Sequence, residues 1–328
     1  MNSLYPLKFK PQFLEKIWGG TKLLKTYHME DEFENIGEVW LLSAVKGQES
    51  IISNGFLAGN TLGELSEIYM GDLLGENVFD QYGSDFPLLI KILDTSDWLS
   101  VQVHPDDELA QKKHNIPNGK TEMWYVMNGG EKAEIISGFN GVCDRIKLKA
   151  ALDNNTVGEL LQSYKTEKGD LFFTPSGMIH AIGPDVTLAE IQQSSDTTYR
   201  LWDWNRKDKD GNTRELHIDD ALDALKYEHE EGGKLEYLAP ENGSSNLVSC
   251  SSFTTNIIKL ESGMLLQKDL FPIDSFVLYL CTEGSARITS EAGSEAISTG
   301  ELLMIPAVLN DIQIVAAENS TILETYMA

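Results

Sequence analysis

The chain has 328 residues, and this length suggests two domains. Hydrophobic residues make up 41% of it and charged residues 23%, which is ordinary for a globular protein with a buried core. Its 51 acidic residues against 26 basic ones give a net charge of −25. Such a charge argues against a nucleic-acid partner, and any site that binds an anion must be a local cluster of basic side chains.

The first residues and the cysteines narrow the class of protein further. Residues 1–20 lack the apolar core of a signal peptide, and no apolar run reaches the roughly 20 residues that a membrane span needs. We therefore expect a cytoplasmic protein with no membrane partner. Cys143, Cys250 and Cys281 are too few and too scattered for a disulfide framework, so we expect free thiols.

Three stretches of the chain predict helices. Residues 61–64 have the spacing of a capping box, ahead of an apolar pattern that runs to about Leu74. The same signature recurs at residues 156–159. Residues 217–227 place their apolar side chains on one helical face.

Most of the remaining chain predicts short β-strands bounded by turn residues, as in a barrel or sandwich. The expected strands are residues 88–93, 99–103, 123–126, 133–137, 170–174, 275–281, 285–290, 301–305, 311–315 and 321–326. Residues 228–252 lie between the two series and are rich in Gly, Glu, Ser and Asn, which is typical of a linker. We therefore expect two domains, residues 1–240 and 241–328.

The two series of strands also resemble each other. Residues 169–175 and 300–306 both have the form G-x5-P, and a glycine turn leads into a strand upstream of each. Two copies of one β-barrel unit explain this similarity more simply than chance does.

Four polar side chains form a candidate metal site. Gln102 and His104 are two residues apart on a predicted strand, so they point the same way. Glu122 opens the strand at residues 123–126, and His180 follows a turn that contains proline and glycine. Two imidazoles, a carboxylate and an amide oxygen suit Zn²⁺, Mn²⁺ or Fe²⁺.

These residues lie within a pattern that resembles the cupins. Residues 169–180 fit the second cupin motif, G-x5-P-x-G-x2-H, and residues 102–129 resemble the first motif with glutamine replacing its first histidine. Glutamine at this position resembles the sequences of the type I mannose-6-phosphate isomerases. Four other segments also resemble those sequences: residues 17–20, 99–106, 119–124 and 195–200. The resemblance covers residues 5–205 strongly, and the length is similar to the shorter bacterial members.

This resemblance implies a mostly β protein of two cupin (jelly-roll) β-barrels with a few peripheral helices. The domain at residues 1–240 would be catalytic, with helical insertions, and the domain at residues 241–328 would be a degenerate cupin. One Zn²⁺ per chain would be held by Gln102, His104, Glu122 and His180. The implied catalytic residues are Lys120, Glu190 and Arg200. The implied substrate contacts are Trp18 at the pocket rim, Lys91 and Ser100 at the phosphate end, and Lys120, Asp196 and Arg200.

The implied reaction interconverts D-mannose 6-phosphate and D-fructose 6-phosphate by moving a proton between C1 and C2 through an enediol(ate). A metal ion or cation stabilises the developing oxyanion while one base relays the proton. Arg200 suits the first role, because its guanidinium is always charged. Lys120 and Glu190 both remain candidates for the base.

Two departures from the family pattern limit what the resemblance implies. Longer members carry a histidine where this chain has Gly119, so the group that opens the sugar ring stays undefined. In the second copy, Val308 and Asp311 replace the positions of Gly177 and His180. We therefore expect the second copy to lack a metal site and to serve a structural role.

Two other functions remain compatible with the same residues. A cupin oxygenase would bind Fe²⁺ at the same four ligands and activate oxygen, although Gln102 and Lys120 argue against it. A non-catalytic sugar-binding cupin is the other alternative, because fold does not fix function. The sequence leaves open whether the protein is a monomer or a homodimer.

Overall fold

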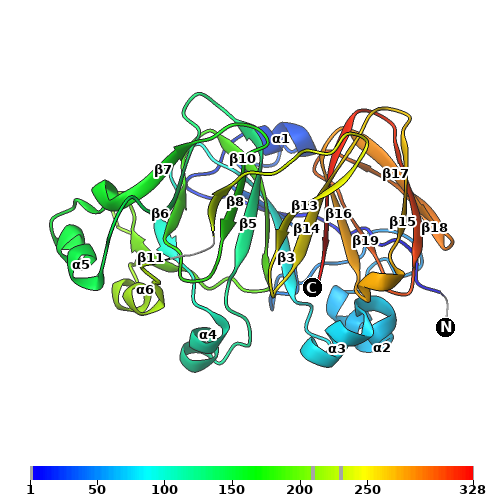
Figure 1. Cartoon of the computed structure of the whole chain (residues 1–328), viewed down its shortest axis with the longest axis horizontal. Helices are drawn as coiled ribbons and strands as arrows, with labels where there is room; N and C mark the ends of the chain where they lie inside the picture. The colour runs from blue at the N-terminus through cyan, green and yellow to red at the C-terminus, as the bar shows by residue number, and fades with distance from the viewer. Residues whose placement is uncertain (1–2, 208–210, 229–231, 328) are drawn as a thin grey trace. The chain divides into compact units, whose positions relative to one another are not determined.

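The computed structural model describes residues 3–207, 211–228 and 232–327 (Figure 1). Strands dominate, and the chain forms two compact units that do not follow chain order. The central unit comprises Leu14–Glu38 and Leu93–Glu236. The split unit comprises Met1–Phe13, Val39–Ile92 and Tyr237–Ala328. The division of function at residue 240 stays a prediction.

The central unit contains two antiparallel β-sheets (Figure 1). In one of them, four of the strands follow one another in the order β10-β5-β8-β12, formed by Val186–Gln193, Glu122–Gly129, Leu171–Thr174 and Gly233–Leu235. The other has the order β11-β4-β9-β6-β7, formed by Tyr199–Trp202, Val101–Val103, His180–Ile182, Glu134–Phe139 and Leu161–Lys165. The helices of this unit are α1 (Lys22–Tyr27), α4 (Asp107–His114), α5 (Arg145–Asp153), η1 (Val157–Leu160) and α6 (Ile218–Ala224).

The core of the central unit lies between its two sheets. Trp124 and Phe172 come from one sheet and Ile135 and Ile182 from the other, and all four are buried in one cluster. Burying each large apolar side chain contributes roughly 1.5–3 kcal/mol, so this cluster holds the sheets together. The predicted metal ligands belong to the same two sheets.

The split unit also contains two antiparallel sheets (Figure 1). One has the order β13-β14-β21-β16-β19, formed by Gly243–Ser249, Thr254–Leu260, Ser320–Tyr326, Val277–Glu283 and Leu302–Ile305. The other has the order β15-β20-β17-β18, formed by Leu265–Asp269, Asp311–Ala316, Ser285–Ser290 and Gly293–Ser298. The remaining elements are β1 (Gln12–Leu14), β2 (Glu38–Leu42), β3 (Leu88–Asp94), α2 (Leu62–Leu74), α3 (Glu76–Tyr82) and η2 (Phe271–Ile273).

The two G-x5-P segments have the same local structure. The amide of Gly169 donates to the carbonyl of Val126, and the amide of Gly300 donates to that of Cys281, both at 2.8 Å. Both glycines have positive φ angles, of 94° and 89°, which favour glycine because it lacks a Cβ. The strands β8 and β19 then end immediately before Pro175 and Pro306. This matching geometry supports the interpretation of the two segments as copies of one unit.

Several sequence predictions need correction. The predicted capping box of Thr61 and Glu64 is confirmed at the start of α2. At the second predicted capping box, Val157–Leu160 form a short 3₁₀ helix, and the side chain of Thr156 does not cap it. The predicted linker contains two strands, β12 and β13. The short helices α1, α3, α4 and α5 were not predicted. No helix in the described parts of the chain is long and apolar enough to cross a membrane.

A buried carboxylate joins the two sheets of the split unit. Glu324 on β21 is fully buried and accepts hydrogen bonds from Tyr279 at 2.8 Å and from Asn256 at 2.9 Å. The ammonium of Lys268, which comes from β15 in the other sheet, lies 2.8 Å from the same carboxylate. Burial, together with the adjacent charge of Glu324, raises the pKa of Tyr279 well above its ordinary value.

Replacing Lys268 should therefore destabilise the protein. In Lys268→Met, Glu324 keeps its two neutral donors but loses its cation, so we expect the free energy of unfolding to fall by about 2 kcal/mol. The matched control is Lys8→Met, whose ammonium pairs with the exposed Glu301 at 3.3 Å and should cost less than about 1 kcal/mol. Chemical denaturation measures both, and equal losses would contradict a structural role for the buried pair.

Candidate metal centre

Three predicted ligands converge at one edge of the central unit. Glu122 is the first residue of β5 and His180 is the first residue of β9. His104 directly follows β4, whose residue Gln102 is paired with His180 across the sheet. The amide of Gly177 donates to the carbonyl of His104 at 2.9 Å, which joins the turn before His180 to the end of β4.

The ligand atoms of these residues lie within 4.8 Å of one another, and all three side chains are buried. The Nε2 atom of His104 is 3.6 Å from Glu122 Oε2, and the Nε2 atom of His180 is 3.4 Å from Glu122 Oε1. Among the described residues, no hydrogen-bond partner serves His104 Nε2 or Glu122 Oε1. Buried polar atoms without partners are costly, and a metal ion between them would satisfy them.

Backbone carbonyls orient both imidazole rings. His104 Nδ1 donates to the carbonyl of Thr197, and His180 Nδ1 donates to that of Met178, each at 2.9 Å. This arrangement leaves a lone pair on each Nε2, which is the form that binds metals. Burial, with a smaller effect from Lys120, lowers the pKa of His104 to about 4, and burial also lowers the pKa of His180. Both rings are therefore neutral at neutral pH.

The carboxylate of Glu122 is ionised although it is buried. Burial alone would raise its pKa, but the adjacent charge of Lys120 and the contacts with the two imidazoles hold it well below the ordinary value. Lys120 Nζ lies 3.0 Å from Glu122 Oε2, and its side chain is 4% exposed. The site thus combines two neutral imidazoles with one carboxylate, a donor set that suits Zn²⁺ and related divalent ions.

Gln102 and Ser100 lie beside the three ligands. The amide Nε2 of Gln102 is 3.2 Å from His180 Nε2, and its Oε1 accepts a hydrogen bond from Ser100 at 3.4 Å. Turning the amide by 180° would exchange these two ends and direct the oxygen toward the site. Ser100 is buried on the same strand face as Gln102.

Glu190 and Arg200 face the same space. Glu190 on β10 is paired with Trp124 on β5, two residues beyond Glu122 and hence on the same sheet face. The indole of Trp124 donates to Glu190 at 3.0 Å, and both side chains are buried. Arg200 on β11 is paired with Gln102, and it donates to the carbonyl of Glu215 at 2.8 Å.

The remaining predicted site residues are Trp18, Asp196 and Lys91. Trp18 is buried in the core cluster with Trp124 rather than exposed at a rim. Asp196 is exposed, in the turn whose next residue, Thr197, holds His104. Lys91 belongs to the split unit, where its ammonium lies 5.0 Å from the ring centre of Trp40. The roles of these three residues stay predictions.

Sequence reasoning missed three residues around the site. Gln192 is paired with Glu122, is fully buried, and follows Glu190 by two residues, a spacing that could have revealed it. Asp107 Oδ1 accepts from the amide of Gly119 at 2.7 Å and from Gln193 at 3.0 Å. Gln193 in turn accepts from the amide of Thr121 at 2.9 Å. These bonds fix the backbone on both sides of Lys120.

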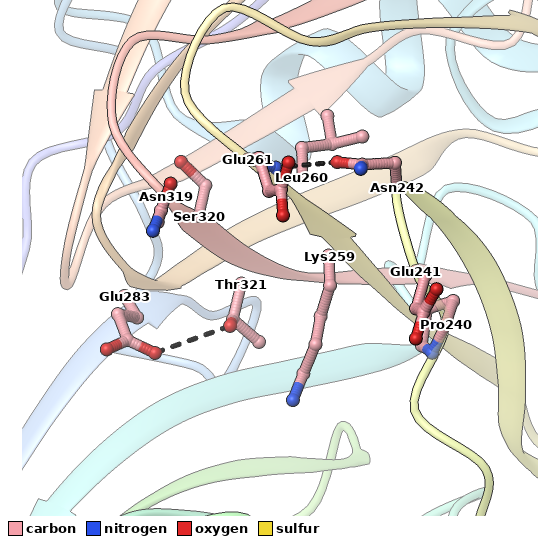
Figure 2. A pocket seen from close by; sticks show the side chains of 10 residues that line it. All are labelled: Pro240, Glu241, Asn242, Lys259, Leu260, Glu261, Glu283, Asn319, Ser320 and Thr321. Carbon is pink, nitrogen blue, oxygen red and sulfur yellow. Dashed lines mark hydrogen bonds between the residues drawn. The ribbon is translucent and has the colours of Figure 1, made fainter.

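A surface cavity of about 540 Å³ lies in the split unit (Figure 2). Its wall carries the carboxylates of Glu241, Glu261 and Glu283 and the ammonium of Lys259, and Thr321 donates to Glu283 at 3.4 Å. None of the predicted site residues lines it. Three carboxylates against one ammonium make this cavity unfavourable for a sugar-phosphate dianion.

Comparison with known proteins identifies the family. Residues 6–144 match the family model described as phosphomannose isomerase type I, catalytic domain. The mannose-6-phosphate isomerase ManA of Bacillus subtilis is 35% identical over 319 residues, which cover 94% of this chain and 95% of that protein. The chain belongs to the type I phosphomannose isomerases.

Two further comparisons agree with this family assignment. The mannose-6-phosphate isomerase of Streptococcus mutans is 35% identical over 321 residues, covering 96% of this chain and 98% of that protein. The crystal structure of mannose 6-phosphate isomerase from Bacillus subtilis superposes with a TM-score of 0.86 at 31% identity, covering 98% and 99% of the two chains. The similarity to this family therefore extends along nearly the whole chain.

The structure explains why this isomerase has glycine at position 119. A Cβ on Gly119 would lie 2.5 Å from the carbonyl carbon of Asp106, 2.6 Å from the oxygen of Pro105 and 2.7 Å from the nitrogen of Asp107. All three are backbone atoms, so the turn would have to move to admit any side chain. The histidine of the longer members therefore does not fit here.

We expect Gly119→Ala to destabilise the protein by about 1–3 kcal/mol, because the added methyl group displaces the turn that supports Lys120. The matched control is Gly63→Ala in α2, where a Cβ would meet no atom within 4 Å and the helix should gain about 0.5–1 kcal/mol. Denaturant unfolding of both variants tests this. A Gly119→Ala variant as stable as the parent would show that the turn yields easily.

Proposed function

We propose that the chain interconverts D-mannose 6-phosphate and D-fructose 6-phosphate at the site formed by His104, Glu122 and His180. The observation that carries this proposal is the convergence of two neutral imidazoles on a buried carboxylate beside Lys120. Membership of the type I phosphomannose isomerases supports the substrate. The sugar phosphate is the small-molecule partner.

The metal in this proposal is one Zn²⁺ per chain. His104, Glu122 and His180 would hold it, with Gln102 as the fourth ligand through its amide oxygen. Three or four protein ligands of this kind leave a position for substrate. When bound, such an ion polarises the carbonyl oxygen of the sugar without changing its own oxidation state.

The protein's own groups then bind the sugar and carry the proton. Lys120 lies 3.0 Å from the ionised carboxylate of Glu122, and its position beside the site suits it to stabilise negative charge on the substrate. Glu190, held by the indole of Trp124, is the group that we assign to move the proton between C1 and C2. Arg200, with its permanent charge, would orient the substrate and stabilise the developing enediolate.

We also infer that each unit contributes one cupin barrel, with the metal site in the first copy alone. The matching turns at Gly169 and Gly300 support a common origin for the two copies. Asp311 stands where His180 stands in the first copy, so the second copy lacks the histidine that a metal would need. The division into a catalytic region at residues 1–240 and a structural one at residues 241–328 follows from this inference.

A coupled assay on mannose 6-phosphate tests the proposed function. We expect turnover that a chelator abolishes and Zn²⁺ restores, and that His104→Gln removes together with the bound metal. The control is His28→Asn, an exposed residue with a left-handed backbone conformation that asparagine accepts. Full metal occupancy without turnover would contradict the proposal, and oxygen uptake would then favour an oxygenase.

The assignment of the base is tested by Glu190→Gln. We expect kcat to fall by about 10²–10⁴-fold with metal content unchanged, because general acid–base catalysis contributes a factor of that size. The exchange of the C2 hydrogen with solvent deuterium should fall in parallel. If Glu190→Gln retains exchange while Lys120→Gln abolishes it, Lys120 is the base instead.

A further inference from the structure

A cluster of arginines surrounds one buried carboxylate in the central unit. Asp203 is 5% exposed, and its Oδ1 lies 2.5 Å from Nη2 of both Arg206 and Arg214. Its Oδ2 accepts from Nε of Arg214 at 2.7 Å. Arg206 also reaches the exposed Asp97 at 3.2 Å. Two guanidinium groups are thus fixed in place by one carboxylate.

A bulge interrupts the pairing of β11 with β4 just before Asp203. Arg200 is paired with Gln102, but Trp202 is paired with Val101, so the register shifts by one residue between them. Such a bulge reverses which side chains share a face. Trp202 accordingly packs on the apolar cluster that contains Val101, and Asp203 directly follows the end of β11.

The cluster is positively charged and adjoins Arg200. Burial lowers the pKa of Arg200, and the charges of Arg214 and Arg206 lower it further, while those of Asp203 and Glu215 raise it. Arg200 also donates to the carbonyl of Glu215, the residue after Arg214. In the described part of the chain, the buried Nε groups of Arg200 and Arg206 have no acceptor. Asp203 engages Nε and Nη2 of Arg214, and among the described residues it does not engage Nη1.

We propose that Arg206 and Arg214, positioned by Asp203 beside Arg200, bind the phosphoryl group of the sugar phosphate. This inference rests on the proposed function for its substrate. Guanidinium groups match the geometry of phosphate oxygens, and they stay charged when partly buried. The cluster provides the local basic island that a chain with a net charge of −25 requires to attract a dianion.

The position of the cluster fits the length of the substrate. Ser100 donates to Gln102, and the carbonyl of the preceding residue, Leu99, accepts from the indole of Trp204, which follows Asp203. A sugar with its reacting carbons at the metal would therefore extend its phosphate along this segment toward the arginines. Trp204 fixes the turn after Asp203, because its indole donates to the carbonyl of Leu99 at 2.7 Å and packs on Trp98.

The test compares Arg214→Gln and Arg206→Gln with the control Arg145→Gln. Arg145 is an exposed residue that pairs with Asp223 and donates to the carbonyl of Leu222. For the first two variants we expect KM for mannose 6-phosphate to rise about tenfold to a hundredfold, because each loses a charged hydrogen bond. The kcat at saturation should stay within threefold. The control should retain both constants.

Binding of inorganic phosphate, measured by titration calorimetry on the zinc-loaded protein, separates this inference from the proposed function. We expect phosphate to bind the parent protein and Arg145→Gln alike, and to bind Arg214→Gln at least tenfold more weakly. This result would support the anion site even if the protein did not turn over mannose 6-phosphate. Unchanged KM and phosphate affinity, with a lower melting temperature alone, would overturn the inference and leave the arginines a structural role.

Discussion

The hydrogen bonds from the two imidazole Nδ1 groups to backbone carbonyls are the constraint on which the site depends. They direct the Nε2 atoms of His104 and His180 toward Glu122, and they fix the tautomer that can bind a metal. Their acceptors, Thr197 and Met178, belong to turns rather than to strands. The loops that join the strands of the central unit are therefore as important to the site as the strands themselves.

The electrostatics of the site follow from burial. Glu122 is fully buried, and it remains ionised because the ammonium of Lys120 lies 3.0 Å from it. A buried charge that is only partly compensated is costly to maintain for stability alone, and such groups concentrate at functional sites. Burial also keeps both histidines neutral, so the ligands are in their metal-binding form before a metal arrives.

Much of this arrangement could be predicted from the sequence because strand periodicity and family motifs carry it. Gln102 and His104 share a face through a spacing of two, and the G-x5-P segments indicated the repeat. The proximity of Asp107 and Gln193 to Lys120 could not be predicted, because it depends on hydrogen bonds between residues 86 positions apart. The bulge after Arg200 also escaped prediction, since a register shift depends on the partner strand and leaves no pattern in one strand's sequence.

The most direct test of the central claim is anomalous X-ray diffraction from crystals of the zinc-loaded protein, recorded on both sides of the zinc absorption edge. We predict one strong anomalous peak per chain, about 2.0–2.1 Å from the Nε2 atoms of His104 and His180 and within bonding distance of a Glu122 oxygen. A zinc peak elsewhere in the chain, with no peak between these three residues, would contradict the assignment of the metal centre.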